Sequence, residues 1–291
     1  MNNYKKFYDD ISFWYQQNKI AFPWQNHNDP FYAFVAGYCA QQTQIIRVIE
    51  IWTKLIKSFP TIAKVANASN AELLKTWDNA GYPKRVINMK KAAQIIMTQH
   101  SGNIPSNFEQ LKELPGIGDY TAAVILSFGH KQDVPTIDIN FMRILGRYFF
   151  GKDVIDKNDM NNLLKKLNKK DTFHFWNPAI MDFGSLVCNS NPKCEKCILN
   201  KKCTSYTKNL LPKKERNKTR YIGSNRFFRG KVLSILRKSQ KNKIEITQLK
   251  EKIDDYKINQ TKYKEIISKL ENDELISIKN NYIYLGNYKE K

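Results

Sequence analysis

Residues 114–123 read Leu-Pro-Gly-Ile-Gly-Asp-Tyr-Thr-Ala-Ala and join one predicted helix to the next through two closely spaced glycines. Glycine has no Cβ, so Gly116 and Gly118 let backbone N–H groups approach an anion, and the next helix adds the positive end of its dipole. We interpret the segment as a helix-hairpin-helix that grips phosphate without reading sequence, with Leu114 and Thr121 as further candidate DNA contacts. A lone Gly-x-Gly between helices is often a simple tight turn, so the interpretation depends on the rest of the chain.

The cysteines indicate a metal centre. Of the 5 in the chain, all but one follow the pattern Cys188-x5-Cys194-x2-Cys197-x5-Cys203. Thiolates are soft ligands that select zinc or iron–sulfur clusters. Structural zinc typically uses two close pairs, whereas one Cys-x2-Cys pair flanked by single cysteines suits a [4Fe–4S] cluster. The sequence therefore predicts a [4Fe–4S] cluster on these residues, and zinc is the alternative.

Length and charge narrow the class of protein. The chain has 291 residues, 42% of them hydrophobic, which excludes global disorder. Lys and Arg number 48 against 27 Asp and Glu, for a formal net charge of +21. A field of that size favours a polyanionic partner, nucleic acid first and an acidic membrane second, although an AT-rich genome also enriches lysine.

The sequence shows no sign of a membrane-bound or exported protein. No apolar run approaches the roughly 20 residues that span a bilayer, and the N-terminus has no signal-like apolar stretch. We expect a cytoplasmic protein of bacterial or archaeal type that associates with the nucleoid when bound to DNA.

Residues 1–203 are predicted to be mostly helical. Apolar residues recur at helical spacing, and short loops with glycine or proline separate the stretches. These stretches are Phe34–Leu55, Ala71–Trp77, Val86–Met97, Thr121–Phe128, Phe141–Phe149 and Met160–Leu167.

The C-terminal part is predicted to form a small module. Three helical patterns and one alternating segment follow each other over 226–238, 246–253, 261–270 and 275–285. With a hairpin turn at Asn280-Asn281, this order describes a winged helix-turn-helix. Residues 204–291 hold 22 basic and 10 acidic side chains, so we favour contact with DNA over a packing or dimerisation role.

Up to about residue 205, the chain resembles the iron–sulfur helix-hairpin-helix DNA glycosylases, the superfamily of endonuclease III and adenine DNA glycosylase (MutY), and most of all the adenine-glycosylase branch. The matching motifs are Phe22-Pro-Trp24, Asp29-Pro-Phe-Tyr32, Gln41-Gln-Thr-Gln44, Phe59-Pro-Thr61, Ala80-Gly-Tyr82, Leu114–Thr121, Met181-Asp-Phe-Gly184 and the cysteines. The resemblance implies an all-α fold of two lobes with DNA bound in the cleft between them, followed by the winged module. The division that we expect is 22–132 for a six-helix lobe with the hairpin, 1–21 and 133–206 for the cluster lobe, 207–225 for a linker and 226–291 for the basic winged domain.

The resemblance also implies which residues act. Gln41, Gln42 and Tyr82 would wedge into the base stack where the target nucleotide is flipped out. Asp138, in Thr136-Ile-Asp-Ile-Asn140, matches the essential aspartate of the family, although an aspartate at a helix start is often only an N-cap. A carboxylate there stabilises the positive charge that builds on the deoxyribose as the base leaves.

Tyr120 lies where bifunctional relatives carry the lysine that forms a Schiff base with the sugar. A phenol forms no Schiff base, so we predict hydrolysis without a β-elimination step. By resemblance, thymine-mismatch glycosylases of the superfamily share this pair of tyrosine and aspartate, and Tyr120 would orient Asp138 by a hydrogen bond.

Gly37 departs from the family pattern. Adenine glycosylases carry at this position, four residues before Gln41, a glutamate that protonates adenine and activates water. Loss of such help costs about 10²–10⁴ in rate. Three hypotheses stay open: the acid comes from elsewhere, the excised base leaves more easily than adenine, or the protein only binds its target.

Two further departures concern the cluster and the tail. The first cysteine gap has five residues where the family usually has six, and the winged module replaces the Nudix-like domain that reads 8-oxoguanine. The predicted function is a monofunctional DNA glycosylase, monomeric, acting on double-stranded DNA with a mispaired or damaged base, which is adenine by resemblance. A thymine/uracil or other modified-base glycosylase, and a lesion-binding protein that has lost catalysis, are the alternatives.

Overall fold

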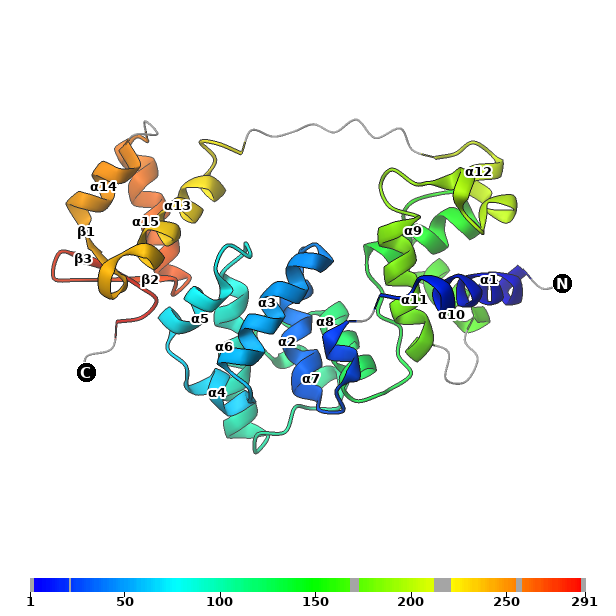
Figure 1. Cartoon of the computed structure of the whole chain (residues 1–291), viewed down its shortest axis with the longest axis horizontal. Coiled ribbons are helices and arrows are strands. Elements are labelled where there is room, and N and C mark those ends of the chain that lie inside the picture. The colour runs from blue at the N-terminus through cyan, green and yellow to red at the C-terminus, as the bar shows by residue number, and fades with distance from the viewer. Residues whose placement is uncertain (1–2, 21, 168–172, 212–220, 255–257, 289–291) are drawn as a thin grey trace. The chain divides into compact units, whose positions relative to one another are not determined.

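Most of the described chain is helical, as the apolar periodicity of the sequence predicts (Figure 1). The computed structural model describes residues 3–20, 22–167, 173–211, 221–254 and 258–288. The chain divides into two units, residues 1–33 with 118–216 and residues 34–117 with 217–291. The expected division into lobes stays a prediction. Within the described ranges, no helix is both long enough and apolar enough to span a membrane.

The first unit is helical throughout its described part. Its elements are α1 (Asn3–Asn18), a 3-10 turn (Pro23–Asn26), the start of α2 (Pro30–Ala40), α8 (Asp119–Val124) with a π-helical extension (Ile125–Gly129), α9 (Ile139–Leu145) with another (Gly146–Phe150), α10 (Lys157–Leu167), α11 (Phe173–Leu186), two 3-10 turns (Cys194–Lys196 and Asn200–Lys202) and α12 (Thr204–Thr207).

Aromatic rings form the centre of this unit. Phe7 of α1 meets Trp176 of α11 edge-on at 5.4 Å between ring centroids and lies 4.7 Å from Tyr148. Trp176 is fully buried, and such large rings dominate the apolar area that a core removes from water. The same core holds Phe141 and Ile144 of α9. Packing therefore fixes the start of α9, where Asp138 lies.

The second unit combines five complete helices with the C-terminal module. After the end of α2 come α3 (Ile45–Ser58), α4 (Ile62–Asn67), α5 (Asn70–Trp77), α6 (Lys84–Gln99) and α7 (Phe108–Glu113). The short helices begin at side-chain caps, since Thr61, Ser69 and Asn107 each accept a hydrogen bond from a backbone N–H of the first turn. The N–H groups of the first turn have no hydrogen-bond acceptor within the helix, and the capping oxygens supply one.

One predicted helical stretch is interrupted in the structure. Apolar spacing runs through Phe34–Leu55, yet α2 ends at Ala40 and α3 begins at Ile45. Gln42, between them, has a left-handed φ of 52°. The prediction of continuous helical periodicity was wrong here because tertiary contacts take up the carbonyls of this segment, as described below.

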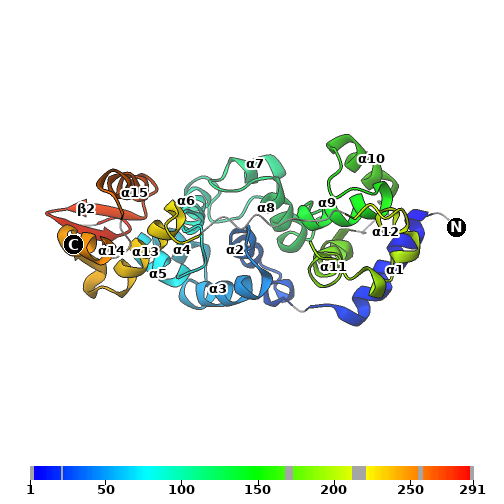
Figure 2. The same cartoon turned by 90° about the horizontal axis from the view of Figure 1, so that it is seen from above.

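The C-terminal module confirms the predicted order and adds a strand. It consists of α13 (Asn225–Lys238), a 3-10 turn (Gln240–Asn242), β1 (Lys243–Glu245), α14 (Ile246–Asp254), α15 (Gln260–Asn272), β2 (Ile276–Lys279) and β3 (Tyr282–Leu285) (Figures 1 and 2). The sheet has the order β1-β3-β2, and all pairs are antiparallel, with Ile283 opposite both Ile244 and Ile278. Strand β1 was missed because three residues are too few to show an alternating pattern. Asn280 and Asn281 both have positive φ, as the predicted tight turn requires.

The module packs against α5 and α6 through polar groups and one close backbone approach. Asn70 Nδ2 donates to the carbonyl of Glu274 over 3.3 Å, and Lys84 pairs with Asp273 at 2.7 Å. A Cβ on Gly286 would lie 2.7 Å from Asn70 Cβ, so glycine lets the end of the sheet touch α5. In the predicted linker, residues 212–220 lie outside the described part of the chain.

Candidate functional site

The hairpin between α7 and α8 shows what its two glycines do. Gly116 has φ +79°, and a Cβ there would lie 2.9 Å from Asn88 Cβ and 3.2 Å from the ring of Tyr38. This position therefore admits only glycine. A Cβ on Gly118 would meet nothing within 4 Å. Gly118 is the N-cap of α8 and leaves open space at the helix end that carries the positive end of the dipole.

The other two predicted hairpin contacts are buried. Leu114 is 2% exposed and Thr121 is 3% exposed. Their side chains pack inside the protein, so a contact with DNA at these positions would use backbone atoms.

The predicted wedge residues lie near the hairpin. Gln41 and Gln42 form the break between α2 and α3, and Gln41 Nε2 donates to the carbonyl of Gly116 over 3.0 Å. Tyr82, with φ 45°, ends the turn between α5 and α6 and is 46% exposed. An aromatic ring this exposed in a tight, strained turn is available to a ligand.

Arg85 joins the two wedge segments and was missed from the sequence. The side chain is 7% exposed and packs 4.9 Å from the ring of Trp77. Its guanidinium donates to the carbonyls of Tyr38 (3.3 Å), Cys39 (3.1 Å), Gln41, Ala80 (3.3 Å), Gly81 (3.0 Å) and Tyr82 (3.4 Å), and to Thr43 Oγ1 (3.0 Å). One buried cation thus satisfies the carbonyls at the end of α2 and in the turn before α6. In Lys84-Arg85 the sequence shows only two basic residues at a helix start, a pattern typical of exposed charge.

Asp138 is the N-cap of α9, and its carboxylate is partly buried. Its side chain accepts hydrogen bonds from the Phe141 N–H and from Asn140 Nδ2, each over 2.8 Å. Burial raises the pKa of Asp138, while the two hydrogen bonds and the charge of Arg143 oppose that shift. The N-cap reading and the catalytic reading of this residue are therefore compatible, since the cap orients the carboxylate that the reaction uses.

Tyr120 lies close enough to Asp138 to feel its charge. Burial, and then the negative charge of Asp138, raise the pKa of the Tyr120 phenol, so it stays neutral and protonated at neutral pH. The hydroxyl makes no hydrogen bond to Asp138 in the described structure. Asn140, rather than Tyr120, orients the carboxylate.

A chain of contacts links Asp138 to the cysteine loop. Arg143 Nη2 donates to Asn140 Oδ1 over 2.6 Å and to the Gly184 carbonyl over 3.0 Å, and Arg143 Nε donates to the Cys188 carbonyl over 2.7 Å. A Cβ on Gly184 would lie 2.6 Å from Asn140 Cβ, which explains the glycine of the Met181–Gly184 motif. These hydrogen bonds connect the cysteine loop to the side chain that holds Asp138.

The cysteines predicted as metal ligands are all free thiols and line one cavity. Arg147, 1% exposed, lies in the same lining with Nη1 3.7 Å from Cys188 Sγ, and it pairs with Asp153 at 2.6 Å. Within the described ranges, His, Cys, Asp and Glu side chains form no group of three or more placed to hold a metal ion. The donor set nonetheless fits a thiolate-bound cluster, because four soft ligands face one space beside a buried cation.

Comparison with known proteins agrees with this geometry. Residues 35–170 match the model of the HhH-GPD superfamily of base excision DNA repair proteins. The chain is similar to an adenine DNA glycosylase of Mycobacterium tuberculosis, with 31% identity over 236 residues, covering 78% of this chain and 77% of that protein. The chain belongs to the HhH-GPD superfamily.

Two further relatives carry different substrate names. An adenine DNA glycosylase of Buchnera aphidicola is 35% identical over 211 residues, 70% of this chain and 60% of that one. The structure of a thermostable thymine-DNA glycosylase superposes with a TM-score of 0.65 at 26% identity, covering 70% of this chain and 97% of that one. The expected superfamily is confirmed, and the relatives include both purine and pyrimidine enzymes.

The predicted departure at Gly37 lies inside this superfamily region. Gly37 is buried within α2, between the buried side chains of Ala36 and Tyr38. The nearest acids in sequence are both exposed: Asp29 accepts a hydrogen bond from the Phe31 N–H over 2.9 Å, and Glu50 pairs with Arg47 at 2.6 Å. Helix α2 therefore carries no acid of its own to protonate a leaving base.

Proposed function

We propose that this HhH-GPD protein is a monofunctional DNA glycosylase that flips a mispaired or modified base out of duplex DNA and hydrolyses its N-glycosidic bond. The observation that carries the proposal is Asp138, a partly buried carboxylate oriented by two hydrogen bonds beside a neutral phenol and linked to a loop of four cysteines. An isolated N-cap needs neither that burial nor that linkage.

Asp138 would act on the sugar. As the bond from C1′ to the base nitrogen breaks, its electron pair leaves with the base and positive charge develops on the deoxyribose ring. A carboxylate in a partly desolvated place stabilises this charge more than it would in water. Water then bonds to C1′ and releases a proton, which leaves an abasic site in the strand.

Tyr120 would limit the reaction to hydrolysis. Its phenol stays protonated because burial and Asp138 raise its pKa, and it has no amine to form an imine with the opened sugar. The protein should release the base and leave the DNA backbone intact.

Adenine is the base that the similarity to adenine DNA glycosylases favours. The absence of an acid on α2 is the observation in favour of a second candidate, a thymine or uracil mismatch, because a pyrimidine base departs as a stabilised anion and needs less help from a general acid.

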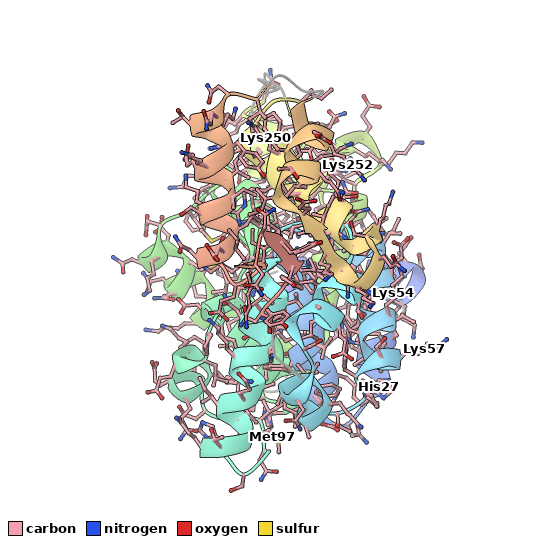
Figure 3. The ribbon with its side chains drawn as sticks, turned by 90° about the vertical axis from the view of Figure 1, so that its left-hand side faces the viewer. His27, Lys54, Lys57, Met97, Lys250 and Lys252 are labelled. Atoms are coloured by element: carbon pink, nitrogen blue, oxygen red, sulfur yellow. The ribbon has the colours of Figure 1, made fainter. Side chains whose placement is uncertain are left out.

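Two parts of the chain would hold duplex DNA as the substrate. The open space at Gly118 and the first turn of α8 would receive a phosphate, and Gln41, Gln42 and Tyr82 would occupy the gap in the base stack. The module adds charge, and Lys250 and Lys252 of α14, like Lys54 and Lys57 of α3, project from the surface (Figure 3). Affinity should fall steeply with salt because phosphate contacts release counterions.

Cys188, Cys194, Cys197 and Cys203 would hold a [4Fe–4S] cluster. When bound, the cluster would act as a rigid cross-link of its loop. Hydrogen bonds from Arg143 to the Cys188 carbonyl and to Asn140, and from Asn140 to Asp138, would then hold the carboxylate in a fixed position relative to the loop.

A glycosylase assay on a panel of duplexes tests the proposal. Matched strands carry adenine, thymine, uracil or modified bases in mispairs, and base release is read by alkaline cleavage of the abasic site under single turnover. The expected result is release from at least one mispair, no strand cleavage before alkali, and loss of release in Asp138→Asn. A wild type that binds mispairs but releases no base from any of them would contradict the proposal and favour the lesion-binding alternative.

A further inference from the structure

The side-chain amide of Asn177 lies where three segments of the first unit meet. Asn177 is part of α11, which packs against α9 and against the π-helical extension of α8. It is fully buried, and so are Ser127 in that extension and Thr136 in the segment that leads to Asp138. Burial of an amide is costly unless its polar atoms are hydrogen-bonded, so the partners of Asn177 show what it holds in place.

Each polar atom of the amide has a partner in these segments. Asn177 Oδ1 accepts from the Thr136 N–H over 2.9 Å, and Nδ2 donates to the Val134 carbonyl over 2.8 Å. Nδ2 also donates to Ser127 Oγ over 2.8 Å. A backbone N–H only donates and a carbonyl only accepts, so Thr136 and Val134 together fix which way the amide faces. The side chain thus binds the segment before Asp138 as the backbone of a neighbouring strand would.

Ser127 connects this amide to the helix that carries Tyr120. Helix α8 continues directly into the π-helical extension that contains Ser127. Tyr120 packs against a cluster that includes Val124 and Phe128, and Met181 of α11 packs against the same cluster. The hydrogen bonds of the amide therefore join the segment before the candidate carboxylate to the helix that bears the candidate phenol.

One face of α11 contacts three parts of the candidate site. Asn177, Met181 and Gly184 are spaced i, i+4 and i+7, which places them on the same side of a helix. The first holds the segment before Asp138, and the second packs against the cluster around the phenol. The third lies against Asn140, which donates to the carboxylate. Within this face, Asn177 is the residue that hydrogen-bonds to the backbone leading to the carboxylate.

We infer that Asn177 is a positioning residue that fixes the Asp138 carboxylate relative to α8, and so relative to the sugar of the flipped nucleotide. The inference rests on the proposed function, in which the start of α8 holds a phosphate of the substrate strand. A shift between α8 and Asp138 would then move the carboxylate away from the sugar, and a misplacement of about 1 Å can cost about 10²-fold in rate. Asn177 is buried and acts through Val134 and Thr136, without touching the substrate.

Single-turnover kinetics separate a positioning role from a purely structural one. With the full-length protein in saturating excess over a duplex that the wild type cleaves at the glycosidic bond, the rate constant reports the bound, folded protein and does not depend on the folded fraction. Titration with a duplex that carries a tetrahydrofuran abasic analogue counts the protein that is folded and binds DNA. A structural role lowers the titrated fraction and the Tm, whereas a positioning role lowers the rate constant.

Asn177→Leu removes all three hydrogen bonds and nearly keeps the volume. We expect the rate constant to fall by roughly 10- to 100-fold, while affinity for the abasic-analogue duplex stays within about threefold of the wild type. The matched control is Asp182→Ala on the same helix, where a buried carboxylate accepts from the Ile20 N–H over 2.9 Å. This control should lower the Tm and leave the rate constant unchanged, because its partner belongs to the segment after α1.

Ser127→Ala tests the connection to α8 by itself. The variant removes one oxygen and leaves both hydrogen bonds between Asn177 and the segment before Asp138. The rate constant should fall by roughly 3- to 10-fold, the effect of one hydrogen bond, and Ser127→Ala should add no further loss to Asn177→Leu. Ser127→Ala also decides the question if Asn177→Leu does not fold.

Failure of the inference can be distinguished from failure of the proposed function. A wild type that releases no base from any duplex overturns both. A wild type that releases base, with an unchanged rate constant in Asn177→Leu or in Ser127→Ala, overturns the inference alone. A rate constant that falls equally in Asp182→Ala also overturns it, because a general loss of stability would then account for the effect.

Discussion

Two buried arginines organise the two candidate regions, and they do so with different partners. Among the hydrogen bonds of Arg85, all but one go to backbone carbonyls, so it positions the wedge and the turn without touching an acid. Arg143 divides its donors between a side chain, Asn140, and the backbone of Gly184 and Cys188. The Arg85 network holds backbone segments in place and so determines the course of the chain at the wedge. The Arg143 network ends at the carboxylate of Asp138, so a substitution in it should change the rate of base release.

Asp138→Asn should have the largest effect on activity. The substitution removes the charge that stabilises the sugar cation, so base release should fall by about 10³-fold or more under single turnover. Binding of an abasic duplex should change little because the volume is nearly conserved.

Stability provides the control for that variant. Because the folded-state pKa of Asp138 is raised, ionisation of its carboxyl destabilises the folded protein at pH values above the unfolded pKa. Asparagine removes that cost and remains a good N-cap, so the Tm at pH 7 should be equal or higher. A large drop in Tm would indicate that the loss of activity comes from misfolding.

Arg85→Met should have the largest effect on stability. It leaves several buried carbonyls without a donor and should lower the free energy of unfolding in urea by about 3 kcal/mol. The matched control is Arg47→Met on α3, whose exposed pair with Glu50 is worth less than about 1 kcal/mol. Equal losses in the two variants would show that the Arg85 network is not the scaffold described here.

Arg143→Gln should affect the chemistry more than the fold. The substitution weakens the link from the Cys188 loop to Asn140, and base release should slow by roughly 10- to 100-fold, as for groups that orient a ligand or catalytic residue. Lys157→Gln removes the same charge from an exposed position on α10 of the same unit and should leave the rate unchanged. An unaltered rate in Arg143→Gln would mean that Asp138 is held by its cap alone.

The two hairpin glycines should separate stability from binding. Gly116→Ala places a Cβ against Asn88 at positive φ and should destabilise the protein by about 1–3 kcal/mol. Gly118→Ala meets only open space, so the melting temperature should hold while affinity for duplex DNA falls by roughly tenfold through a displaced phosphate. If Gly118→Ala leaves the affinity unchanged, the hairpin does not hold a phosphate at this point.

The smallest expected effect is a shift of the pH profile. Base release requires the ionised carboxylate, so the rate should fall as the pH drops through the pKa of Asp138, which burial raises from its ordinary value. Asn140→Ala removes a hydrogen bond that lowers this pKa, and the acid limb should move to higher pH. Asn161→Ala, exposed on α10, is the control. A limb that stays in place in Asn140→Ala would mean that Asn140 does not tune Asp138.

Local sequence patterns predicted much of this molecule. The spacing of apolar residues and the Asn-Asn turn were enough to predict α13, α15 and the β2–β3 hairpin, because both features depend on neighbours a few residues away. The same reasoning failed at the break after Ala40. There the carbonyls of the segment accept hydrogen bonds from Arg85, which lies 44 positions from Gln41 in the sequence.

The sequence by itself determined the superfamily, the hairpin, the carboxylate at Asp138, the phenol at Tyr120 and the glycine at position 37, since these are residue types at characteristic spacings. Only the tertiary structure decided that Arg85 reaches Gln41, that Arg143 reaches Cys188 and that Arg226 meets Tyr82. These three contacts join segments distant in the chain, and their geometry follows from packing of whole helices, which no local spacing encodes.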